Sequence, residues 1–300
     1  MQLITETQVA QTLRGVSARA ALHQAFVQLE RGQAAVLPRG RAVATHEGAA
    51  LMVSAMGAVL AGSGVLGTKV YSTRNGQFQF VITLFDTATG LPLATLEANE
   101  LTRIRTSVTT ALAVDALAAP TVKVLAFFGA GMQAQAHAEA LRPLRNFERV
   151  LVCARSGAAA FAARIGAEVV DAATAAVAAD VLVTCTRATE PLFDGGLVKP
   201  GALVAAVGSS KPTARELDDA LLARAAQVVV EWLPAAQAEA GELVRAAPGV
   251  IAPERVVELG SLLAAPPQPR DPQAIVVYKS VGIGLEDVAL AHLVYRTLKG

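Results

Sequence analysis

The 300-residue sequence has little charge, few aromatic residues and only two cysteines. Charged residues make up 17% of the chain and the net charge is +1, so we expect no basic surface of the kind that binds nucleic acid. No apolar run reaches the about 18 uncharged residues that a membrane-spanning helix requires. The first residues show neither the basic n-region nor the apolar h-region of a signal peptide. We therefore expect a cytoplasmic protein with no nucleic-acid and no membrane partner.

Metal-binding and disulfide patterns are also missing. Cys153 and Cys185 both lie in strand-like apolar runs, where small buried thiols are more common than a disulfide or a metal site. The four histidines stand at no metal-ligand spacing: His23, His46, His137 and His292. We expect no metal, and structural or exposed roles for these four side chains.

Apolar residues, in contrast, are abundant. They make up 53% of the sequence, and the mean hydropathy is +0.44. Parallel strands that are buried on both faces would account for this composition, together with a sizeable interface between subunits.

The most informative segment is a strand followed by a glycine-rich turn. Residues 122–128 form a near-continuous apolar run, as in a parallel strand covered on both faces. A turn and a helix pattern follow, with the sequence Gly129-Ala130-Gly131-Met132-Gln133-Ala134. Gly129 permits a tight turn, Gly131 lets the backbone approach a pyrophosphate, and Ala134 keeps the helix near the strand. In this context we interpret the segment as dinucleotide-binding rather than as a plain structural turn.

The second strand of this unit indicates which dinucleotide is preferred. NAD-binding units usually carry a carboxylate at the tip of that strand, where it holds the ribose 2′-hydroxyl. Here the strand at 150–154 ends in Arg155 and Ser156, which suit a 2′-phosphate. We therefore predict NADP(H) as the preferred cofactor, with NAD(H) possible. The alternative is that Arg155 is an exposed cation without a ligand.

The rest of the chain divides into two kinds of pattern. Turn signals between short apolar runs at 50–96 suggest an antiparallel sheet, and Arg105 and Thr106 are expected to begin a helix that ends near residue 118. Residues 121–278 alternate strands and helices, as in a doubly wound sheet. The expected strands are 122–128, 150–154, 168–170, 181–184, 203–207, 228–231 and 275–278. The last segment, 284–299, has a helical pattern.

Four ordered motifs together resemble the ornithine cyclodeaminase/mu-crystallin family. They are Gly67-Thr68-Lys69-Val70, the run Glu100 to Thr106, the glycine loop, and Lys279-Ser280-Val281-Gly282-Ile283-Gly284-Leu285-Glu286-Asp287. The resemblance implies an α/β protein in which a Rossmann-type doubly wound dinucleotide-binding domain (120–279) is inserted into an α+β substrate and dimerisation domain (1–119 and 280–300). It also implies a homodimer.

Two positions point to the reductase branch of this family. Cyclodeaminases carry an Asp after the strand near residue 207, whereas this chain has Ser210 there, and Ser54 stands where they carry a Glu. The resemblance is nearest to the ketimine reductases. It implies NADPH-dependent reduction of Δ1-pyrroline-2-carboxylate or Δ1-piperideine-2-carboxylate, giving L-proline or L-pipecolate. Ornithine cyclodeaminase, an alanine dehydrogenase-like activity and a mu-crystallin-like ligand-binding role are the alternatives.

A 2-imino or 2-oxo acid needs cations for its carboxylate and a proton donor. By analogy with the family, Arg41, Lys69 and Arg105 clamp the carboxylate, with Arg39 an equally basic neighbour of Arg41. Thr106 adds a backbone N–H at the expected start of the helix, and Lys69 is also the candidate proton donor. For each cation alone, a solvated surface position would be more common.

The remaining candidates follow strand ends, where open α/β sheets bind ligands. Ser210 is expected to hydrogen-bond the substrate or an ordered water, or else to cap a turn. We expect cofactor contacts from Thr186, Val207, Gly208 and Lys279. Glu286 and Asp287 are expected to cap the last helix and to contact the other domain rather than to take part in catalysis.

Overall fold

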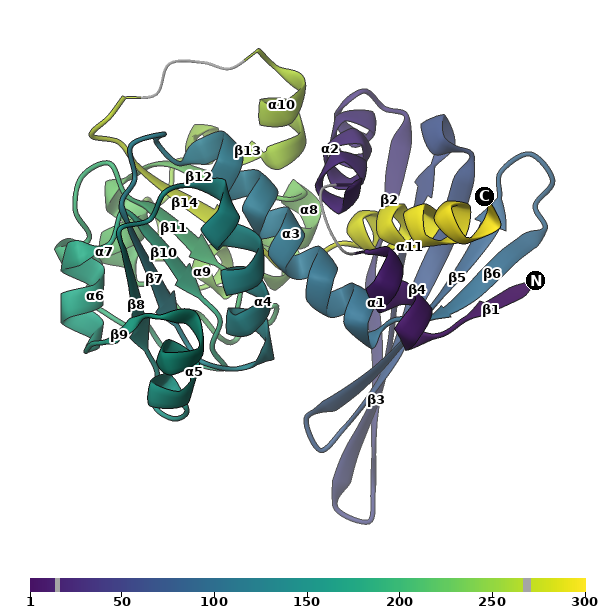
Figure 1. Ribbon diagram of the computed structural model, residues 1–300, viewed down its shortest axis with the longest axis horizontal. Helices are drawn as coiled ribbons and strands as arrows, with labels where there is room; N and C mark the ends of the chain where they lie inside the picture. The colour runs from purple at the N-terminus through teal and green to yellow at the C-terminus, as the bar shows by residue number, and fades with distance from the viewer. Residues whose placement is uncertain (14–16, 267–270) are drawn as a thin grey trace. The chain divides into compact units, whose positions relative to one another are not determined.

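The computed structural model describes residues 1–13, 17–266 and 271–300, and these form two compact units. Unit 1 consists of Met1–Thr109 and Gly282–Gly300, and unit 2 of Thr110–Val281. The expected limits lay at 119/120 and 279/280. Helix α3 (Asn99–Leu117) carries the chain from unit 1 into unit 2, and the C-terminal segment returns to unit 1 (Figure 1).

Unit 2 is built on an eight-stranded sheet in which every pairing is parallel. The strand order is β13-β12-β14-β11-β10-β7-β8-β9, so the chain starts at β7 and winds outward in both directions. All residues of β10, β11 and β14 are buried, which requires cover on both faces of the sheet. The predicted doubly wound Rossmann-type fold is therefore confirmed.

The strands of unit 2 are β7 (Val124–Phe128), β8 (Arg149–Cys153), β9 (Glu168–Val169), β10 (Val181–Thr184), β11 (Leu203–Ala206), β12 (Ala225–Val230), β13 (Val256–Glu258) and β14 (Ile275–Lys279). Its helices are α4 (Met132–Leu141), α5 (Ala158–Ile165), α6 (Ala172–Ala178), α7 (Asp219–Arg224), α8 (Leu233–Glu239), α9 (Gly241–Val244) and α10 (Leu259–Ala264). Short 3₁₀ turns lie at Arg142–Leu144, Gly195–Leu197 and Pro253–Arg255.

Unit 1 contains a six-stranded sheet in the order β1-β6-β5-β4-β3-β2. β1 and β6 are parallel and the other neighbours are antiparallel, as the turn signals predict for residues 50–96. The strands are β1 (Gln2–Ile4), β2 (Ala34–His46), β3 (Ala49–Leu60), β4 (Val65–Arg74), β5 (Gln77–Asp86) and β6 (Pro92–Glu97), with a 3₁₀ turn at Ala61–Ser63. The sequence did not predict β2, because Pro38 and Gly40 interrupt the alternation of apolar and polar residues. The pairing of β2 with β3 shifts register at the same place, between Leu37 and Gly40.

Three further helices belong to unit 1: α1 (Glu6–Thr12), α2 (Ser17–Glu30) and α11 (Gly284–Lys299). α11 runs along the sheet beside α2 (Figure 1). Its first turn lies directly on strand backbone, because a Cβ atom at Gly284 would come within 2.4 Å of the Gly57 backbone nitrogen. Gly57 in turn lies close to the backbone of β4, because a Cβ atom at Gly57 would come within 2.3 Å of the Gly67 carbonyl oxygen. Only glycine allows this approach of α11 to β3 and β4.

The expected start of helix α3 is wrong. The helix begins at Asn99, not at Arg105, because the Glu6 carboxylate from α1 caps its first turn. Glu6 accepts hydrogen bonds from the backbone N–H groups of Asn99 (2.7 Å) and Glu100 (2.9 Å). Arg105 and Thr106 consequently lie inside the helix, where backbone N–H groups bond to carbonyls one turn earlier.

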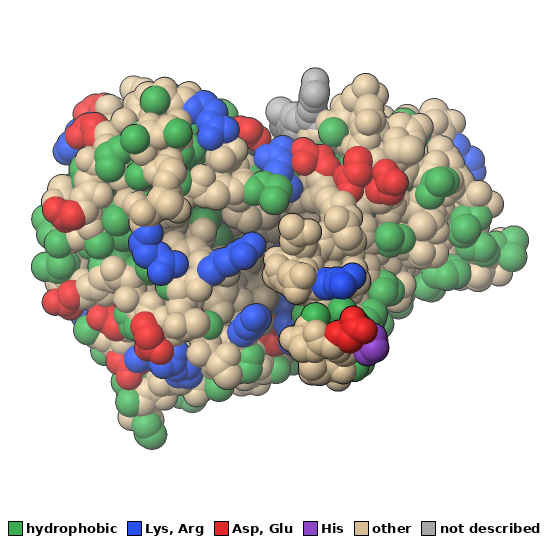
Figure 2. All heavy atoms as spheres, turned by 90° about the horizontal axis from the view of Figure 1, so that it is seen from below, with side chains coloured by type: hydrophobic (Ala, Val, Ile, Leu, Met, Phe, Trp, Pro, Cys, Tyr) green, Lys and Arg blue, Asp and Glu red, His purple; other side chains and the backbone are tan. Residues whose placement is uncertain are grey.

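The face of the unit 1 sheet opposite α11 keeps apolar side chains in contact with solvent. Val53 is 50% exposed, Val70 43% and Val81 43%, and Val70 stands directly opposite Val81 in the β4–β5 ladder. Hydrophobic side chains also reach the face of the molecule seen in Figure 2. Among the described helices, none is long and apolar enough to span a bilayer.

Candidate functional site

The predicted site residues fall into two groups, and each group lies within one unit. The substrate-side cations Arg41, Lys69 and Arg105 belong to unit 1, and the cofactor-side residues belong to unit 2.

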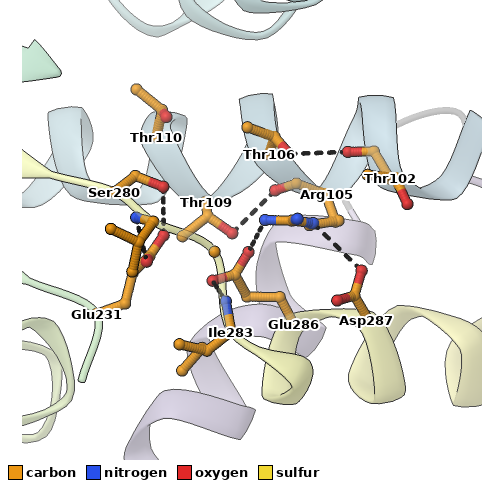
Figure 3. A network of polar contacts seen from close by, with 12 residues as sticks. Thr102, Arg105, Thr106, Thr109, Thr110, Glu231, Ser280, Ile283, Glu286 and Asp287 are labelled. Carbon is orange, nitrogen blue, oxygen red and sulfur yellow. Dashed lines mark hydrogen bonds and ion pairs between the residues drawn. The ribbon is translucent and has the colours of Figure 1, made fainter. Parts of the chain in front are cut away.

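Lys69 and Arg105 are buried and form ion pairs with two acids of α11. Lys69 Nζ lies 2.8 Å from Asp287 Oδ1, and only 1% of the Lys69 side chain is exposed. Arg105 Nη1 lies 2.7 Å from Glu286 Oε2, and Arg105 Nε lies 3.2 Å from Asp287 Oδ1. Figure 3 shows Arg105 reaching from α3 toward both acids. The sequence motif around residue 105 and the motif around residue 286 therefore form one charged cluster.

The alternation of β4 explains why a lysine is buried here. Every second residue of β4, from Val65 through Lys69 to Tyr71, points to the covered face of the sheet. The Lys69 ammonium also lies over aromatic rings, 4.7 Å from the Phe80 centroid and 6.0 Å from that of Tyr71. Burial lowers the pKa of Lys69 to about 8; Asp287 opposes this shift, and the charges of Arg105 and Arg39 add to it. Lys69 can therefore exchange a proton near neutral pH.

The two arginines of β2 are placed differently. Arg39 is half-buried, and its Nη2 donates a 2.8 Å hydrogen bond to the Gly282 carbonyl, close to the charged cluster. Arg41 is exposed, and it lies opposite Ser54 in the β2–β3 ladder. The hydroxyl of Ser54 is buried and finds no hydrogen-bond partner among the described residues. The contact with Gly282 joins Arg39 to the cluster.

The backbone N–H of Thr106 donates to a carbonyl one helical turn earlier, and its hydroxyl donates to the Thr102 carbonyl at 2.8 Å. The predicted anion contact at a helix start does not arise at this position, because the helix starts at Asn99.

The glycine loop of unit 2 has the geometry that a dinucleotide requires. Gly129 follows β7 with φ +109°, and a Cβ atom there would come within 2.7 Å of the Cys185 carbonyl oxygen. Gly131 is the N-cap of α4, and a Cβ atom built on it would meet nothing within 4 Å. Open space therefore adjoins the free N–H groups at the start of this helix, where a pyrophosphate would bind.

The next residues of α4 complete this loop. Met132 is 67% exposed, while Ala134 is fully buried against the sheet, as predicted for the third position of the motif. The Gln133 side-chain oxygen is buried and has no hydrogen-bond partner within the described ranges. The residues present therefore fit a bound nicotinamide dinucleotide.

Arg155 and Ser156 are exposed in the turn after β8. This turn adjoins the glycine loop, because a Cβ atom at Gly157 would lie 3.7 Å from the Ala130 side chain. Arg155 and Ser156 therefore lie in a turn beside the loop that the sequence predicts to hold the dinucleotide, and their contact with a 2′-phosphate stays a prediction.

Glu216, for which the sequence predicted no role, organises the ends of two neighbouring strands. Its buried carboxylate accepts hydrogen bonds from two hydroxyls at the end of β10, that of Thr184 within the strand and that of Thr186 after it, each at 2.7 Å. It also accepts from the backbone N–H groups of Thr186 (2.9 Å) and Gly208 (2.7 Å). Because one carboxylate accepts hydrogen bonds from both loops, Glu216 fixes the two loops relative to each other.

Lys279, predicted to contact the cofactor, is fully buried at the end of β14. Its Nζ pairs with Glu242 at 3.0 Å and donates to the Ser209 carbonyl at 2.8 Å. Glu242 in turn accepts from the Glu216 backbone N–H at 2.9 Å. Lys279 therefore supports the loop that carries half-buried Ser210, and Thr186, Val207 and Gly208 lie on the loops that this network holds.

His137 is buried on α4 and has two partners. Its Nδ1 donates to the Gln133 carbonyl at 2.7 Å, which leaves Nε2 to accept from the Thr110 hydroxyl at 3.0 Å. Burial lowers the pKa of His137 to about 4, so the ring is neutral at pH 7. Among the residues that the structure describes, no group of three or more His, Cys, Asp or Glu side chains is arranged to hold a metal ion.

Comparison with known proteins agrees with this architecture. The family model described as "Ornithine cyclodeaminase/mu-crystallin family" matches residues 1–300. The chain is 34% identical to the mouse (Mus musculus) protein named ketimine reductase mu-crystallin over 265 residues, which cover 84% of this chain and 82% of the mouse protein.

Two solved structures are similar over nearly the whole chain. The probable ornithine cyclodeaminase of Bordetella pertussis Tohama I is 45% identical with a TM-score of 0.92, and the match covers 99% of this chain and 97% of that one. The Δ1-pyrroline-2-carboxylate reductase of Thermococcus litoralis, solved with NADH and L-proline, is 27% identical with a TM-score of 0.90. That match covers 100% of this chain and 98% of the other.

The network around Glu216 gives a first prediction. Glu216→Gln turns one acceptor oxygen into an NH₂ group that faces hydroxyl and N–H donors. We expect the free energy of unfolding to fall by about 1.5–3 kcal/mol, the range for a hydrogen bond to a charged group. Urea denaturation measures this loss, and coenzyme titration should show weaker binding. Glu190→Gln is the control, since Glu190 is 67% exposed and pairs only at the surface with Arg245. Equal stability of the two variants would contradict the prediction.

Proposed function

The chain belongs to the ornithine cyclodeaminase/mu-crystallin family, and on that premise we propose that it reduces a cyclic ketimine carboxylate with NADPH. The chain is an NAD(P)H-dependent oxidoreductase that acts on imine substrates. The proposed substrates are Δ1-pyrroline-2-carboxylate and Δ1-piperideine-2-carboxylate, and the products are L-proline and L-pipecolate. The T. litoralis structure supports the five-membered ring, because it holds NADH and L-proline.

The observation that carries the proposal is the charge of the buried cluster in unit 1. Lys69 and Arg105 pair with two carboxylates, Glu286 and Asp287, and the charge of Arg39 acts on Lys69. With all five charged, one net positive charge remains, which suits a substrate with one carboxylate. Arg105 and Arg39 would bind that carboxylate, and exposed Arg41 on the same strand would attract it.

Lys69 would donate the proton. When bound, the dinucleotide supplies a hydride to C2 of the ring, and the nitrogen of the reduced bond then needs a proton. A donor with a pKa of about 8 is well matched to this transfer near neutral pH. Ser210 would hydrogen-bond the substrate or a water, since a lone serine hydroxyl is no base near pH 7. An imine that is already formed needs no carboxylate to activate an amine, which agrees with serine at positions 54 and 210.

In unit 2, Gly129, Gly131, Met132, Gln133 and Ala134 would hold the pyrophosphate of the dinucleotide. The loops that Glu216 fixes would border its nicotinamide end. In this proposal Glu216 supports Thr186 and Gly208 and does not contact the cofactor. Lys279 supports the Ser209 carbonyl and likewise makes no contact with the cofactor.

Three incubations test the reaction: NADPH with each cyclic imine, ornithine with NAD, and pyruvate with ammonia and NADPH. We expect NADPH oxidation with the cyclic imine and little turnover in the other two. The second incubation is included because the B. pertussis protein is described as a probable ornithine cyclodeaminase. Ammonia release from ornithine without NADPH oxidation by the imine would refute the proposal. Binding without turnover would favour a mu-crystallin-like carrier.

Lys69→Ala and Arg105→Ala should each reduce kcat/KM for the imine at least a thousandfold, and NADPH affinity should stay within a fewfold. The substrate carboxylate loses one of its cations in the second variant, and in both variants a buried acid loses an ion-pair partner. Fluorescence titration of NADPH and the melting temperature separate a lost site from a lost fold. Arg103→Ala on the same helix is the control, since the Arg103 side chain pairs with Glu100 one turn away.

Arg155→Ala tests the cofactor preference. Loss of a charge-assisted contact of about 1.5–3 kcal/mol corresponds to about a tenfold to hundredfold loss of kcat/KM for NADPH. The value for NADH should change by less than threefold, since NADH has no 2′-phosphate. Arg164→Ala is a matched control, because Arg164 is an exposed arginine on the following helix α5. A wild-type protein that prefers NADH by tenfold would refute the NADPH assignment.

We propose a homodimer that covers the exposed sheet face of unit 1, because a contiguous apolar sheet face of this kind is typical of an interface. Val70→Asp places a charge in the middle of that face, and it should shift the protein from dimer to monomer in sedimentation velocity. Val177→Asp is the control: Val177 is 53% exposed on α6 of unit 2. A wild-type monomer, or an unchanged dimer in the Val70 variant, would contradict this arrangement.

A further inference from the structure

Asp287 makes the closest contact to the proposed proton donor. One of its oxygens, Oδ1, lies 2.8 Å from Lys69 Nζ and 3.2 Å from Arg105 Nε. The other oxygen, Oδ2, is buried and has no hydrogen-bond partner in the part of the chain that the structure describes. Asp287 itself is fully buried. A single carboxylate thus pairs with two cations, although the sequence predicted helix capping and a domain contact for this residue rather than a part in catalysis.

Rigid elements fix the position of this carboxylate relative to Lys69. Lys69 lies in the middle of β4, with β3 and β5 on either side. Asp287 lies in the first turn of α11, whose start is held by a hydrogen bond from the Ile283 N–H to Glu286. The contact of Gly284 with the Gly57 backbone prevents this turn from moving toward the sheet. The distance between Asp287 and Lys69 is therefore set by the packing of a helix on a sheet.

The other groups around Lys69 do not replace Asp287. Arg105 of α3 and Arg39 of β2 repel the ammonium, and burial disfavours its charge. Tyr71 and Phe80 contribute ring faces, which attract a cation more weakly than a carboxylate does. Glu286 of α11 pairs with Arg105 and accepts from Ile283. Asp287 is the described acid that lies in hydrogen-bond contact with Lys69.

We propose that Asp287 is a positioning residue that holds the Lys69 ammonium in place and keeps it charged for proton transfer to the substrate nitrogen. This inference rests on the proposed imine reduction. In that step a hydride adds to C2 and the electron pair of the C=N bond moves to nitrogen. The nitrogen then takes a proton from Lys69 Nζ, so one N–H bond forms and one breaks. Neutral Lys69 regains a proton from solvent before the next turnover, and the Asp287 charge favours that uptake.

Asp287→Asn tests the proposal through the pH profile of kcat/KM. Removal of an opposite charge at this distance lowers a pKa by about one unit or more, so the basic limb should move to lower pH by that amount. The loss of activity should then be about fivefold larger at pH 8 than at pH 6. Glu286→Gln is the matched control: it removes the same charge one residue away, from an acid paired with Arg105, and should move the limb less. Equal shifts in the two variants would overturn a specific role for Asp287.

A second measurement does not depend on turnover. The sequence holds six lysines, so their side-chain amines can be followed by NMR in protein with labelled lysine, and Lys69→Met identifies the Lys69 signal. In Asp287→Asn that signal should titrate at lower pH than in the wild type. A titration that does not move would overturn the proposal. A titration that moves while the kcat/KM profile stays in place would also overturn it, because Lys69 would not be the donor.

Two outcomes keep this inference apart from the proposed function. If the wild type shows no imine turnover, the proposed reaction fails, whatever the variants do. If the wild type turns over and the Asp287→Asn profile is unchanged, only the role of Asp287 fails. If Asp287→Asn does not fold, the kcat and the pH profile of Asp287→Glu test the role of Asp287 instead. It retains the charge but displaces the carboxylate, so kcat should fall at least tenfold with the basic limb in place, and a limb that moves with full kcat would overturn the proposal.

Discussion

Charges buried in unit 1 have to be neutralised by one another, and this requirement connects distant parts of the sequence. Lys69 from β4 and Arg105 from α3 can be buried because Asp287 and Glu286 reach them from α11. Removing one partner of such a pair costs about 3–5 kcal/mol, since it leaves an uncompensated charge in the interior. The same ion pairs that allow burial also fix the geometry around Lys69, a lysine whose pKa is lowered by burial to about 8. Stability and the proposed chemistry thus depend on the same contacts.

In unit 2, the groups that need partners are backbone N–H groups at the ends of strands. The loops after β10 and β11 present N–H groups that no strand satisfies, and Glu216 accepts from both loops. Glu242 then links the Glu216 backbone to Lys279 at the end of β14. Three neighbouring strand ends are held together in this way, at the edge of the sheet where doubly wound folds bind their ligands. The glycine loop is left with open space beside Gly131.

Local patterns were sufficient to predict the fold class, while contacts over long sequence distances were not. The apolar run before Gly129 and the regular alternation after it identify the Rossmann-type unit, because both are properties of neighbouring residues. The start of α3 escaped prediction, since its capping carboxylate is Glu6, far away in the sequence. Glu216 escaped because its partners are mostly hydroxyls and backbone N–H groups. The roles of Lys69, Arg105, Ser210 and Arg155 stay predictions, and their placement in the two units is what the structure adds.

The discontinuity of unit 1 has a consequence for biosynthesis. During translation α11 is made after the whole of unit 2, so the nascent chain holds Lys69 and Arg105 before their acidic partners exist. The contiguous segment of unit 2 can fold as soon as it has emerged from the ribosome. The sheet of unit 1 has to wait longer to bury its cations, because Glu286 is synthesised 181 residues after Arg105.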